Sequence, residues 1–207
     1  MDSPVPKRRL SPAEYLALER AAETRSEYLD GEVFAMAGAG RRHNLITANV
    51  IARLGLQLER RPCEVYPSDM RVTVPATGLY TYPDVVVVCE EPRFEDAELD
   101  TILNPTLLVE VLSGTTAGYD RGAKFDHYRA IESLREVLFV AQDRVHVVRY
   151  ERQEDDTWLL SETRESGDRV LLPSIDAELR IAQVYAKVRL DEASGPAPVS
   201  PQLPLNP

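Results

Sequence analysis

The sequence contains few of the residues that build covalent cross-links or transition-metal sites. Its two cysteines, Cys63 and Cys89, stand in very different contexts, and its three histidines belong to no HExxH motif. We therefore expect neither a disulfide framework nor a zinc site. Any bound metal is then expected to be a hard cation that carboxylate oxygens hold.

The sequence also lacks a long apolar run. No segment approaches the roughly 20 apolar residues that cross a bilayer, and the basic residues 7–9 precede no apolar segment that could act as a signal peptide. The sequence therefore predicts a cytoplasmic protein without a membrane partner. Its length of 207 residues, with 43% hydrophobic and 28% charged residues, is typical of one folded domain.

Positive charge is in deficit, because the formal net charge is −10 at pH 7. A net negative charge opposes binding to nucleic acid, but the negative charges are unevenly distributed along the sequence. Residues 90–100 carry a net charge of −5 and residues 151–169 a net charge of −4. The remaining chain is close to neutral, so it can still present a basic face.

The order of periodic segments predicts an α+β protein. Ser11 has the side chain of a helix cap and precedes a first-turn proline, which predicts a helix that ends near Ala22. Asp30-Gly31 joins two strand-like runs as a hairpin turn. Residues 41–60 repeat apolar side chains at helical spacing and form the longest expected helix.

Residues 84–88 and 107–112 are apolar at every position except Asp84 and Glu110. Strands of this kind are normally covered on both faces, so we expect them at the centre of a sheet with helices against it. Further strands are expected over residues 62–67, 70–74, 137–141, 145–150, 157–163 and 170–172, and helices over residues 122–133 and 182–188. We expect one domain over residues 10–190, a flexible N-terminus over residues 1–9 and a disordered proline-rich tail over residues 191–207.

The carboxylates of Asp84 and Glu110 are unexpected in such strands. An ionised carboxylate among apolar residues costs several kcal/mol unless a cation or several hydrogen-bond donors meet it. Either acid alone could be a strand-end cap or part of a surface ion pair. Two such acids in two central strands indicate a shared function instead.

Two carboxylates on adjacent strands suit Mg²⁺, which takes oxygen ligands and completes its shell with water and substrate phosphate. Such a metal can polarise a phosphodiester and lower the pKa of an attacking water. An ammonium nearby would orient this water and offset the charge of the transition state. Lys124 is the candidate, because it alone of the three lysines follows soon after the Glu110 segment, although a single helical lysine is more commonly solvated.

These residues lie within a recognisable order of motifs. Pro83-Asp84 is followed 26 residues later by Glu110, which resembles the signature of the PD-(D/E)XK nuclease superfamily. Within that superfamily the sequence is similar to the Uma family of restriction endonucleases over about residues 10–188. The motifs that carry this resemblance are Tyr28-Leu29-Asp30-Gly31-Glu32, Arg42-His43, Tyr82-Pro83-Asp84, Val109-Glu110-Val111-Leu112-Ser113, Thr115 or Thr116, Asp120-Arg121, Lys124 and Tyr128.

The resemblance implies an α+β, restriction-endonuclease-like fold, with a central mixed β-sheet flanked by helices and an additional β-hairpin region. One position departs from the superfamily pattern, because Leu112 occupies the place of the usual lysine in Glu-x-Lys. In the Uma pattern the ammonium comes from the following helix, where Lys124 stands. A long lysine side chain can reach around a neighbouring strand.

The activity that the resemblance implies is that of a Mg²⁺- or Mn²⁺-dependent endonuclease, which hydrolyses DNA phosphodiester bonds by water attack. Asp84 and Glu110 would hold the metal, together with the backbone carbonyl of Val111. Glu32 would be a further catalytic acid, and His43 would contact the scissile phosphate or tune Glu32.

Contacts to DNA require cationic side chains, and the candidates are Arg41, Arg42, Arg71 and Arg121. Tyr128 lies one turn beyond Lys124, where it would position the lysine or pack against it. Single-domain nucleases commonly cut two strands by pairing two copies, so we expect a homodimer.

Two other functions fit the same residues. Leu112 and the acidic total favour a catalytically silent nucleic-acid-binding or regulatory module on the same fold. Without the resemblance, Asp84 and Glu110 could be strand-end caps in a protein whose surface mediates self-association. The nuclease hypothesis requires that side chains 84 and 110 turn toward one shared cleft.

Overall fold

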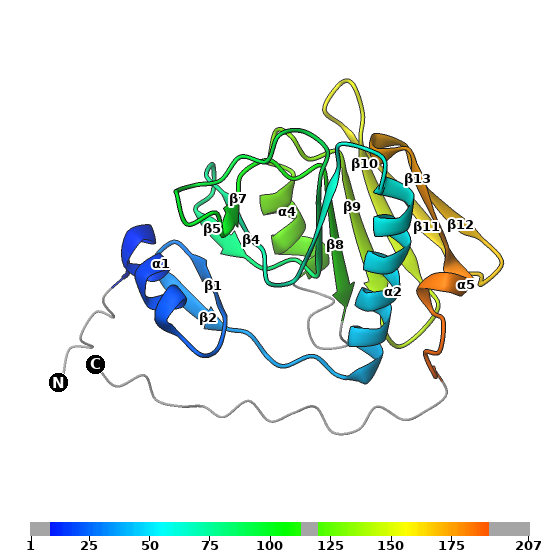
Figure 1. The fold of residues 1–207 in the computed structure, drawn as a ribbon, viewed down its shortest axis with the longest axis horizontal. Helices are drawn as coiled ribbons and strands as arrows, with labels where there is room; N and C mark the ends of the chain where they lie inside the picture. The colour runs from blue at the N-terminus through cyan, green and yellow to red at the C-terminus, as the bar shows by residue number, and fades with distance from the viewer. Residues whose placement is uncertain (1–8, 113–119, 191–207) are drawn as a thin grey trace.

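The computed structural model describes residues 9–112 and 120–190. Within these ranges the strands form a six-stranded sheet, a five-stranded sheet and a two-stranded hairpin (Figure 1). The elements follow in the order α1 (Pro12–Ala21), β1 (Ser26–Leu29), β2 (Glu32–Ala35), α2 (Arg41–Leu58), β3 (Glu64–Pro67), β4 (Arg71–Val74), β5 (Leu79–Thr81), β6 (Val85–Val88), β7 (Thr101–Ile102), β8 (Leu107–Leu112), the π-helical turn η1 (Asp120–Lys124), α4 (Phe125–Tyr128), β9 (Glu136–Ala141), β10 (Val147–Arg152), β11 (Trp158–Thr163), β12 (Arg169–Leu172), the 3₁₀ turn η2 (Pro173–Ile175), β13 (Ala177–Arg180) and α5 (Ile181–Val184).

The first helix and the first hairpin form where local features of the sequence predict them. Ser11 caps α1, because its Oγ accepts a hydrogen bond from the Glu14 N–H at 3.3 Å while Glu14 accepts one from the Ser11 N–H at 2.8 Å. β1 and β2 then pair as an antiparallel hairpin. Asp30 and Gly31 take φ angles of 46° and 88° at its turn, a left-handed conformation that both residue types tolerate. The predicted first helix and hairpin are confirmed.

β6 and β8 lie inside the six-stranded sheet, whose order is β11-β10-β9-β8-β6-β3. The sheet is mixed, because β8 runs antiparallel to β6 and parallel to β9. Every residue of β6 and β8 is buried. This confirms that the two apolar segments form the centre of a sheet, and it makes Glu110 a carboxylate in a buried central strand.

Two apolar cores cover the two faces of the six-stranded sheet. α2 lies across one face, where Ile46, Val50 and Leu54 are fully buried (Figure 1). The other face packs against the five-stranded sheet and α4. We call the second core the inter-sheet core; its buried members are Val72, Val74, Leu79, Val86, Val88, Ile102, Leu108, Leu112, Phe125, Tyr128, Ile131, Leu134, Val137, Phe139 and Val148. Side chains alternate along a strand, so Glu110 points to the inter-sheet side with Leu108 and Leu112.

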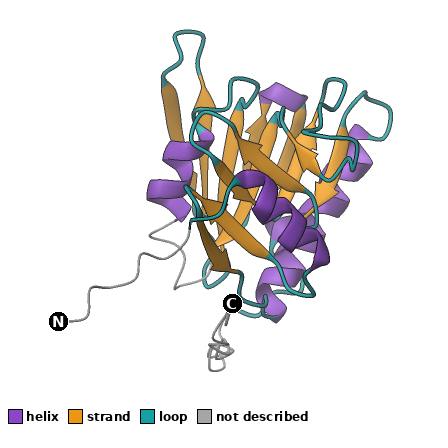
Figure 2. Cartoon of the chain, turned by 90° about the vertical axis from the view of Figure 1, so that its left-hand side faces the viewer, coloured by secondary structure: helices purple, strands orange, loops and turns teal. Residues whose placement is uncertain are grey.

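The five-stranded sheet has the order β2-β1-β5-β4-β7. α1 covers its outer face through contacts among three rings, Tyr15, Tyr28 and Tyr80, whose centroids are 4.9–5.7 Å apart. Alternation along β1 and β5 turns the neighbouring residues 27 and 81 to the opposite face, toward the inter-sheet core. Figure 2 shows the strands packed side by side, with helices beside them.

Two predicted helices are shorter than the sequence pattern indicates. The helix expected over residues 122–133 begins as η1 and ends with α4 at Tyr128, because the chain must then turn into β9. The helix expected over residues 182–188 is reduced to α5. It is preceded by β13, which the sequence did not predict and which pairs antiparallel with β12. β5 and β7 were also not predicted, because strands of two or three residues form only through their partners.

Cys63 and Cys89 form a disulfide bond, which corrects the expectation that these cysteines do not pair. The register of β3 and β6 places Glu64 opposite Val88, so the cysteines that flank this pair meet across the ladder. They are 26 residues apart in the sequence. Their different local contexts gave no indication of the pairing, because only the return of β6 along β3 brings them together.

Residues 1–8 and 191–207 lie outside the described part of the chain, and so do the predictions made for the N-terminus and the proline-rich tail. Arg9 is described and forms an ion pair with Asp30 at 2.6 Å. Among the described helices, none has the length and apolar composition needed to cross a membrane.

Arg71 is buried where α1 meets the five-stranded sheet. Its guanidinium carbon lies 5.9 Å from the ring centroid of Tyr15 and 5.5 Å from that of Tyr82. Its Nη2 donates to Asp100 at 2.8 Å, and Asp100 also accepts from Arg20 of α1 at 2.8 Å. These contacts tie α1 to β4 and to the segment before β7.

Asp100 should make the stability of the protein depend on acid pH. Hydrogen bonding from Arg20 holds the pKa of Asp100 well below its ordinary value. A lowered carboxylate pKa stabilises the folded state above the unfolded pKa of about 3.9, and this contribution is lost as the pH falls through the folded pKa. We therefore expect the free energy of unfolding to fall between pH ~5 and pH ~2, and to fall less in Arg20→Met. Urea unfolding across that range measures the difference; equal slopes in the two proteins would contradict it.

Candidate active site

Asp84 lies one residue before β6 and is held by the neighbouring strand. Its Oδ2 accepts a hydrogen bond from the backbone N–H of Val111 at 2.7 Å. The register of β6 and β8 pairs Val85 with Val109, so one further step along it places Asp84 opposite Glu110. The two acids therefore lie on adjacent strands at the same end of the pair. Both are buried, with exposed fractions of 8% and 5%.

A histidine from α2 contacts the same aspartate. Nε2 of His43 lies 3.1 Å from Oδ1 of Asp84. His43 belongs to the first turn of α2, so the start of this helix lies beside the start of β6. From the sequence, His43 was expected to contact phosphate or to tune Glu32. The structure joins it to Asp84, where it can orient the carboxylate, and its predicted contact with phosphate stays a prediction.

Lys124 meets Glu110 in the interior. Its Nζ lies 3.1 Å from Oε1 of Glu110, and the side chains of the two residues are 6% and 7% exposed. Lys124 is the last residue of η1, so it follows β8 in the sequence and returns to the inter-sheet side of that strand. Lys124 thus brings an ammonium to Glu110, whereas Leu112, at the position of the superfamily's usual lysine, packs into the inter-sheet core.

Tyr128 completes the surroundings of Glu110. It is fully buried, and its hydroxyl donates a hydrogen bond to Oε1 of Glu110. Burial, assisted by the negative charge of Glu110, raises the pKa of Tyr128 well above its ordinary value, so the phenol remains a donor. Tyr128 therefore orients Glu110 directly, one turn beyond the lysine that contacts the same oxygen.

Glu27 is a site residue that the sequence analysis did not identify. Its Oε1 lies 2.9 Å from Nζ of Lys124 and accepts a hydrogen bond from the Thr81 hydroxyl. Glu27 comes from β1 and Glu110 from β8, so Lys124 lies between carboxylates of the two sheets. The available signal was the alternation of β1, which turns Glu27 to the side opposite Tyr28.

Glu32, the further acid expected from the sequence, lies elsewhere. It is exposed on β2, an edge strand of the five-stranded sheet, where it is paired in register with Leu29. Within the described residues, no hydrogen bond or ion pair joins Glu32 to Asp84, Glu110 or Lys124. The carboxylate that approaches Lys124 from the β1–β2 hairpin is Glu27, five positions earlier in the sequence.

The four arginines expected to contact DNA lie in different environments. Arg41 is exposed and Arg42 half-buried in the first turn of α2, next to His43. Arg71 is 3% exposed within its tyrosine and aspartate contacts, which contradicts the prediction that it binds DNA. The side chain of Arg121 lies outside the part of the chain whose side chains are described.

The carboxylate oxygens of this site are the type of ligand that a hard divalent cation prefers. Asp84 and Glu110 offer carboxylates from adjacent strands, and one or two carboxylates with water and phosphate are a common shell for Mg²⁺. Each acid also has a fixed partner that orients it, Val111 for Asp84 and Tyr128 for Glu110. Within the described residues no group of three or more His, Cys, Asp or Glu side chains could hold a metal. Asp84 and Glu110 are the residues that could hold such a cation, and water and substrate would have to fill its remaining positions.

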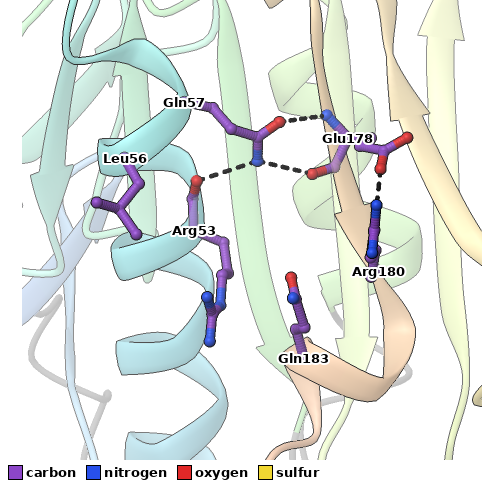
Figure 3. Close-up of a pocket in the computed structure, with 6 residues that line it drawn as sticks. All are labelled: Arg53, Leu56, Gln57, Glu178, Arg180 and Gln183. Carbon is purple, nitrogen blue, oxygen red and sulfur yellow. Dashed lines mark hydrogen bonds and ion pairs between the residues drawn. The ribbon is translucent and has the colours of Figure 1, made fainter.

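A shallow groove of about 250 Å³ lies elsewhere, between α2 and the β13–α5 segment (Figure 3). Its lining residues are Arg53, Leu56, Gln57, Glu178, Arg180 and Gln183. Gln57 exchanges hydrogen bonds of 2.8 and 3.0 Å with the backbone of Glu178, so its amide serves to fasten the helix to the strand. None of the site acids lines this groove.

Comparison with known proteins identifies the family. The Uma2 family, described as "Putative restriction endonuclease", matches residues 12–183. The chain belongs to the Uma2 family. This match spans every described residue of the candidate site, from Glu27 to Tyr128, and it confirms the resemblance found in the sequence.

Two relatives of this Uma2 chain are uncharacterized proteins of Synechocystis sp. One is 41% identical over 153 residues, which cover 74% of this chain and 86% of that protein. The other is 36% identical over 183 residues, which cover 88% of this chain and 94% of that protein. Neither name states an activity.

A solved structure supports the Uma2 assignment at the level of the fold. It is the crystal structure of a protein from Anabaena variabilis described as "a putative nuclease belonging to DUF820". The two structures superpose with a TM-score of 0.69 at 19% sequence identity, over 85% of this chain and 97% of that chain. The predicted α+β, restriction-endonuclease-like fold with a central mixed sheet is therefore confirmed.

Proposed function

We propose that this protein is a Mg²⁺-dependent endonuclease that hydrolyses DNA phosphodiester bonds. The observation that carries the proposal is the 3.1 Å contact between Lys124 and Glu110, next to Asp84 on the adjacent strand. An aspartate and a glutamate on two adjacent central strands, with a lysine beside the glutamate, are groups that suit metal-assisted phosphodiester hydrolysis. The family description supports a nuclease, and the acids and the lysine support this chemistry.

Each residue has a separate task in the proposed reaction. Asp84 and Glu110 would hold Mg²⁺ or Mn²⁺, with the Val111 carbonyl as a third candidate ligand. The bound cation would supply Lewis-acid polarisation of the phosphodiester. The Lys124 ammonium would donate hydrogen bonds to the attacking water or to a phosphate oxygen, where negative charge develops. His43 would keep Asp84 oriented toward the metal.

Hydrolysis forms one bond to phosphorus and breaks another. The oxygen of water attacks phosphorus and the water gives up a proton, while the bond to the leaving oxygen breaks and that oxygen takes up a proton, so the net change is the addition of one water. Charge therefore increases on the phosphate oxygens and on the leaving oxygen, and a cation held near them lowers the barrier. Lys124 is suited to this task because its Nζ lies between two buried carboxylates, one of which is the proposed metal ligand Glu110.

DNA would approach from the side where α2 begins. Arg41 and Arg42 precede His43 in that first turn, and His43 contacts Asp84. Arginines at this position can neutralise phosphates without reading bases. The acidic stretch 151–169 occupies β10, β11 and the loop that follows, at the other edge of the six-stranded sheet. Two copies of the chain, paired as a homodimer, would present two such sites to the two strands of a duplex.

Metal binding is the first test of the proposal. A cation that binds only the folded protein stabilises it by RT ln(1 + [L]/Kd), about 2.7 kcal/mol at a hundredfold excess over Kd. We expect Mg²⁺ or Mn²⁺ to raise the thermal midpoint of the wild-type protein and to leave Asp84→Ala unchanged. Differential scanning calorimetry with and without the metal measures both. Equal shifts in the two proteins would remove Asp84 from the metal site.

Nicking of supercoiled DNA is the second test. Wild-type protein with Mg²⁺ or Mn²⁺ should convert supercoiled plasmid to the open circular form, and EDTA should stop the conversion. Metal-dependent stabilisation without any nicking would favour the catalytically silent binding module, in which the buried Lys124–Glu110 pair is only structural.

A further inference from the structure

Glu27 lies at the candidate site although it comes from a different sheet. We propose that Glu27 is a positioning residue of the nuclease, which acts by holding the Lys124 ammonium at a fixed distance from Glu110. The inference rests on the proposed function, because it assigns a role in the same reaction. It adds a third carboxylate, contributed by β1, to the two acids of β6 and β8.

The contacts of Lys124 support this role. Its Nζ lies 2.9 Å from Oε1 of Glu27 and 3.1 Å from Oε1 of Glu110. The side chains of Glu27, Lys124 and Glu110 are 13%, 6% and 7% exposed, so the attraction is weakly screened by water. A lysine side chain has many rotamers, and anions on two sides restrict the position of its charge.

Glu27 is itself held in place. The hydroxyl of Thr81 donates to the same Oε1 that faces Lys124, and Thr81 is fully buried. β1 and β5 pair Tyr28 with Tyr80, so one step along that register places Glu27 opposite Thr81. The cross-strand pair therefore points one oriented carboxylate at the lysine.

The geometry favours positioning over metal binding by Glu27. Its Oε1 already accepts from an ammonium and a hydroxyl, and a second cation at this oxygen would lie next to Lys124 and be repelled by it. Without Glu27, the ammonium would lose one of the two anions that restrict its position, and its placement relative to Glu110 would change. Glu27 thus positions the lysine, while Glu110 remains the carboxylate that is available to a cation.

The experiment compares Glu27→Gln with a matched control. We expect the single-turnover nicking rate at saturating protein to fall about tenfold to hundredfold in Glu27→Gln, because misplacing a catalytic group costs about this much. The protein concentration for half-maximal rate and the Mn²⁺ dissociation constant should stay within about twofold, because the proposed role of Glu27 is to hold the lysine and not to bind DNA or metal. Glu23→Gln makes the same charge change at an exposed position before β1, and it should keep the wild-type rate.

Two further variants separate positioning from a general structural role. In a Lys124→Met background, Glu27→Gln should cause no additional loss of the residual rate, because its effect passes through the lysine. Thr81→Val removes only the hydroxyl that orients Glu27, and it should give a smaller loss in the same direction. Thr81→Val also serves as the test if Glu27→Gln does not fold, which thermal melting would reveal.

The outcomes distinguish this inference from the proposed function. Wild-type nicking in Glu27→Gln, or additive losses in the double variant, would overturn the role of Glu27 and leave the nuclease proposal standing. A higher protein concentration for half-maximal rate in Glu27→Gln, with an unchanged rate at saturating protein, would also overturn this role. Wild-type protein that nicks no DNA with Mg²⁺ or Mn²⁺ would overturn both.

Discussion

Lys124→Met is expected to lower the rate of DNA nicking by about 10²–10³-fold, the usual loss when one donor to a developing negative charge is removed. The methionine keeps much of the length and apolar character of the lysine stem and removes only the ammonium. Metal binding should survive, because Asp84 and Glu110 remain. The measurement is the nicking rate together with the metal-induced rise in the thermal midpoint.

The same substitution should also lower stability. Lys124 is 5% exposed and lies between two buried carboxylates, and removing one partner of a buried ion pair typically costs about 3–5 kcal/mol. Assays should therefore be run well below the melting temperature of the variant. Lys187→Met is the control, because Lys187 is exposed after α5 and should be replaceable without loss of rate. Nicking at the wild-type rate in a folded Lys124→Met protein would remove this lysine from the mechanism.

Arg71→Ala is expected to lower the free energy of unfolding by about 3 kcal/mol, as truncation of a large buried side chain commonly does. The guanidinium is enclosed by the rings of Tyr15 and Tyr82 and donates to Asp100. An alanine would leave a cavity and break the link between α1 and β4. Urea unfolding measures the loss, and Arg60→Ala, at an exposed position after α2, should leave stability near the wild-type value.

DNA binding provides the complementary measurement for Arg71. A phosphate contact contributes about one unit to the slope of log K against log salt concentration. We expect that slope to be unchanged in folded Arg71→Ala and to decrease by about one unit in Arg41→Ala if Arg41 contacts a phosphate. A stable Arg71→Ala protein with a reduced slope would restore Arg71 as a DNA contact and refute its structural role.

The two acids of the site could be predicted from the sequence because each stands beside or within an otherwise apolar segment. Asp84 and Glu110 interrupt segments that are otherwise apolar, and burial of such segments follows from their composition. The expectation that these segments are central strands is confirmed. Lys124 was chosen because it alone of the three lysines follows soon after the Glu110 segment, and the family resemblance supported that choice. Nothing local distinguishes a helical lysine that turns inward from one that is solvated.

Other contacts could not be predicted because they join segments that are distant in the sequence. The hairpin that contains Glu27 also contains an exposed acid, Glu32, and alternation alone does not say which face of β1 meets the site. Cys63 and Cys89 likewise meet only through the pairing of β3 with β6. Arg71 resembles a surface arginine in sequence, yet α1 folds over it.

The sequence by itself determined the elements whose signals are local. A capping serine, an Asp-Gly turn and uniformly apolar strands each stabilise one conformation over a few residues, whatever the rest of the chain does. Only the tertiary structure decided which charged groups meet. Two sheets had to pack face to face before Lys124 could lie between Glu27 and Glu110, because contact energies between distant residues exist only after the chain has folded.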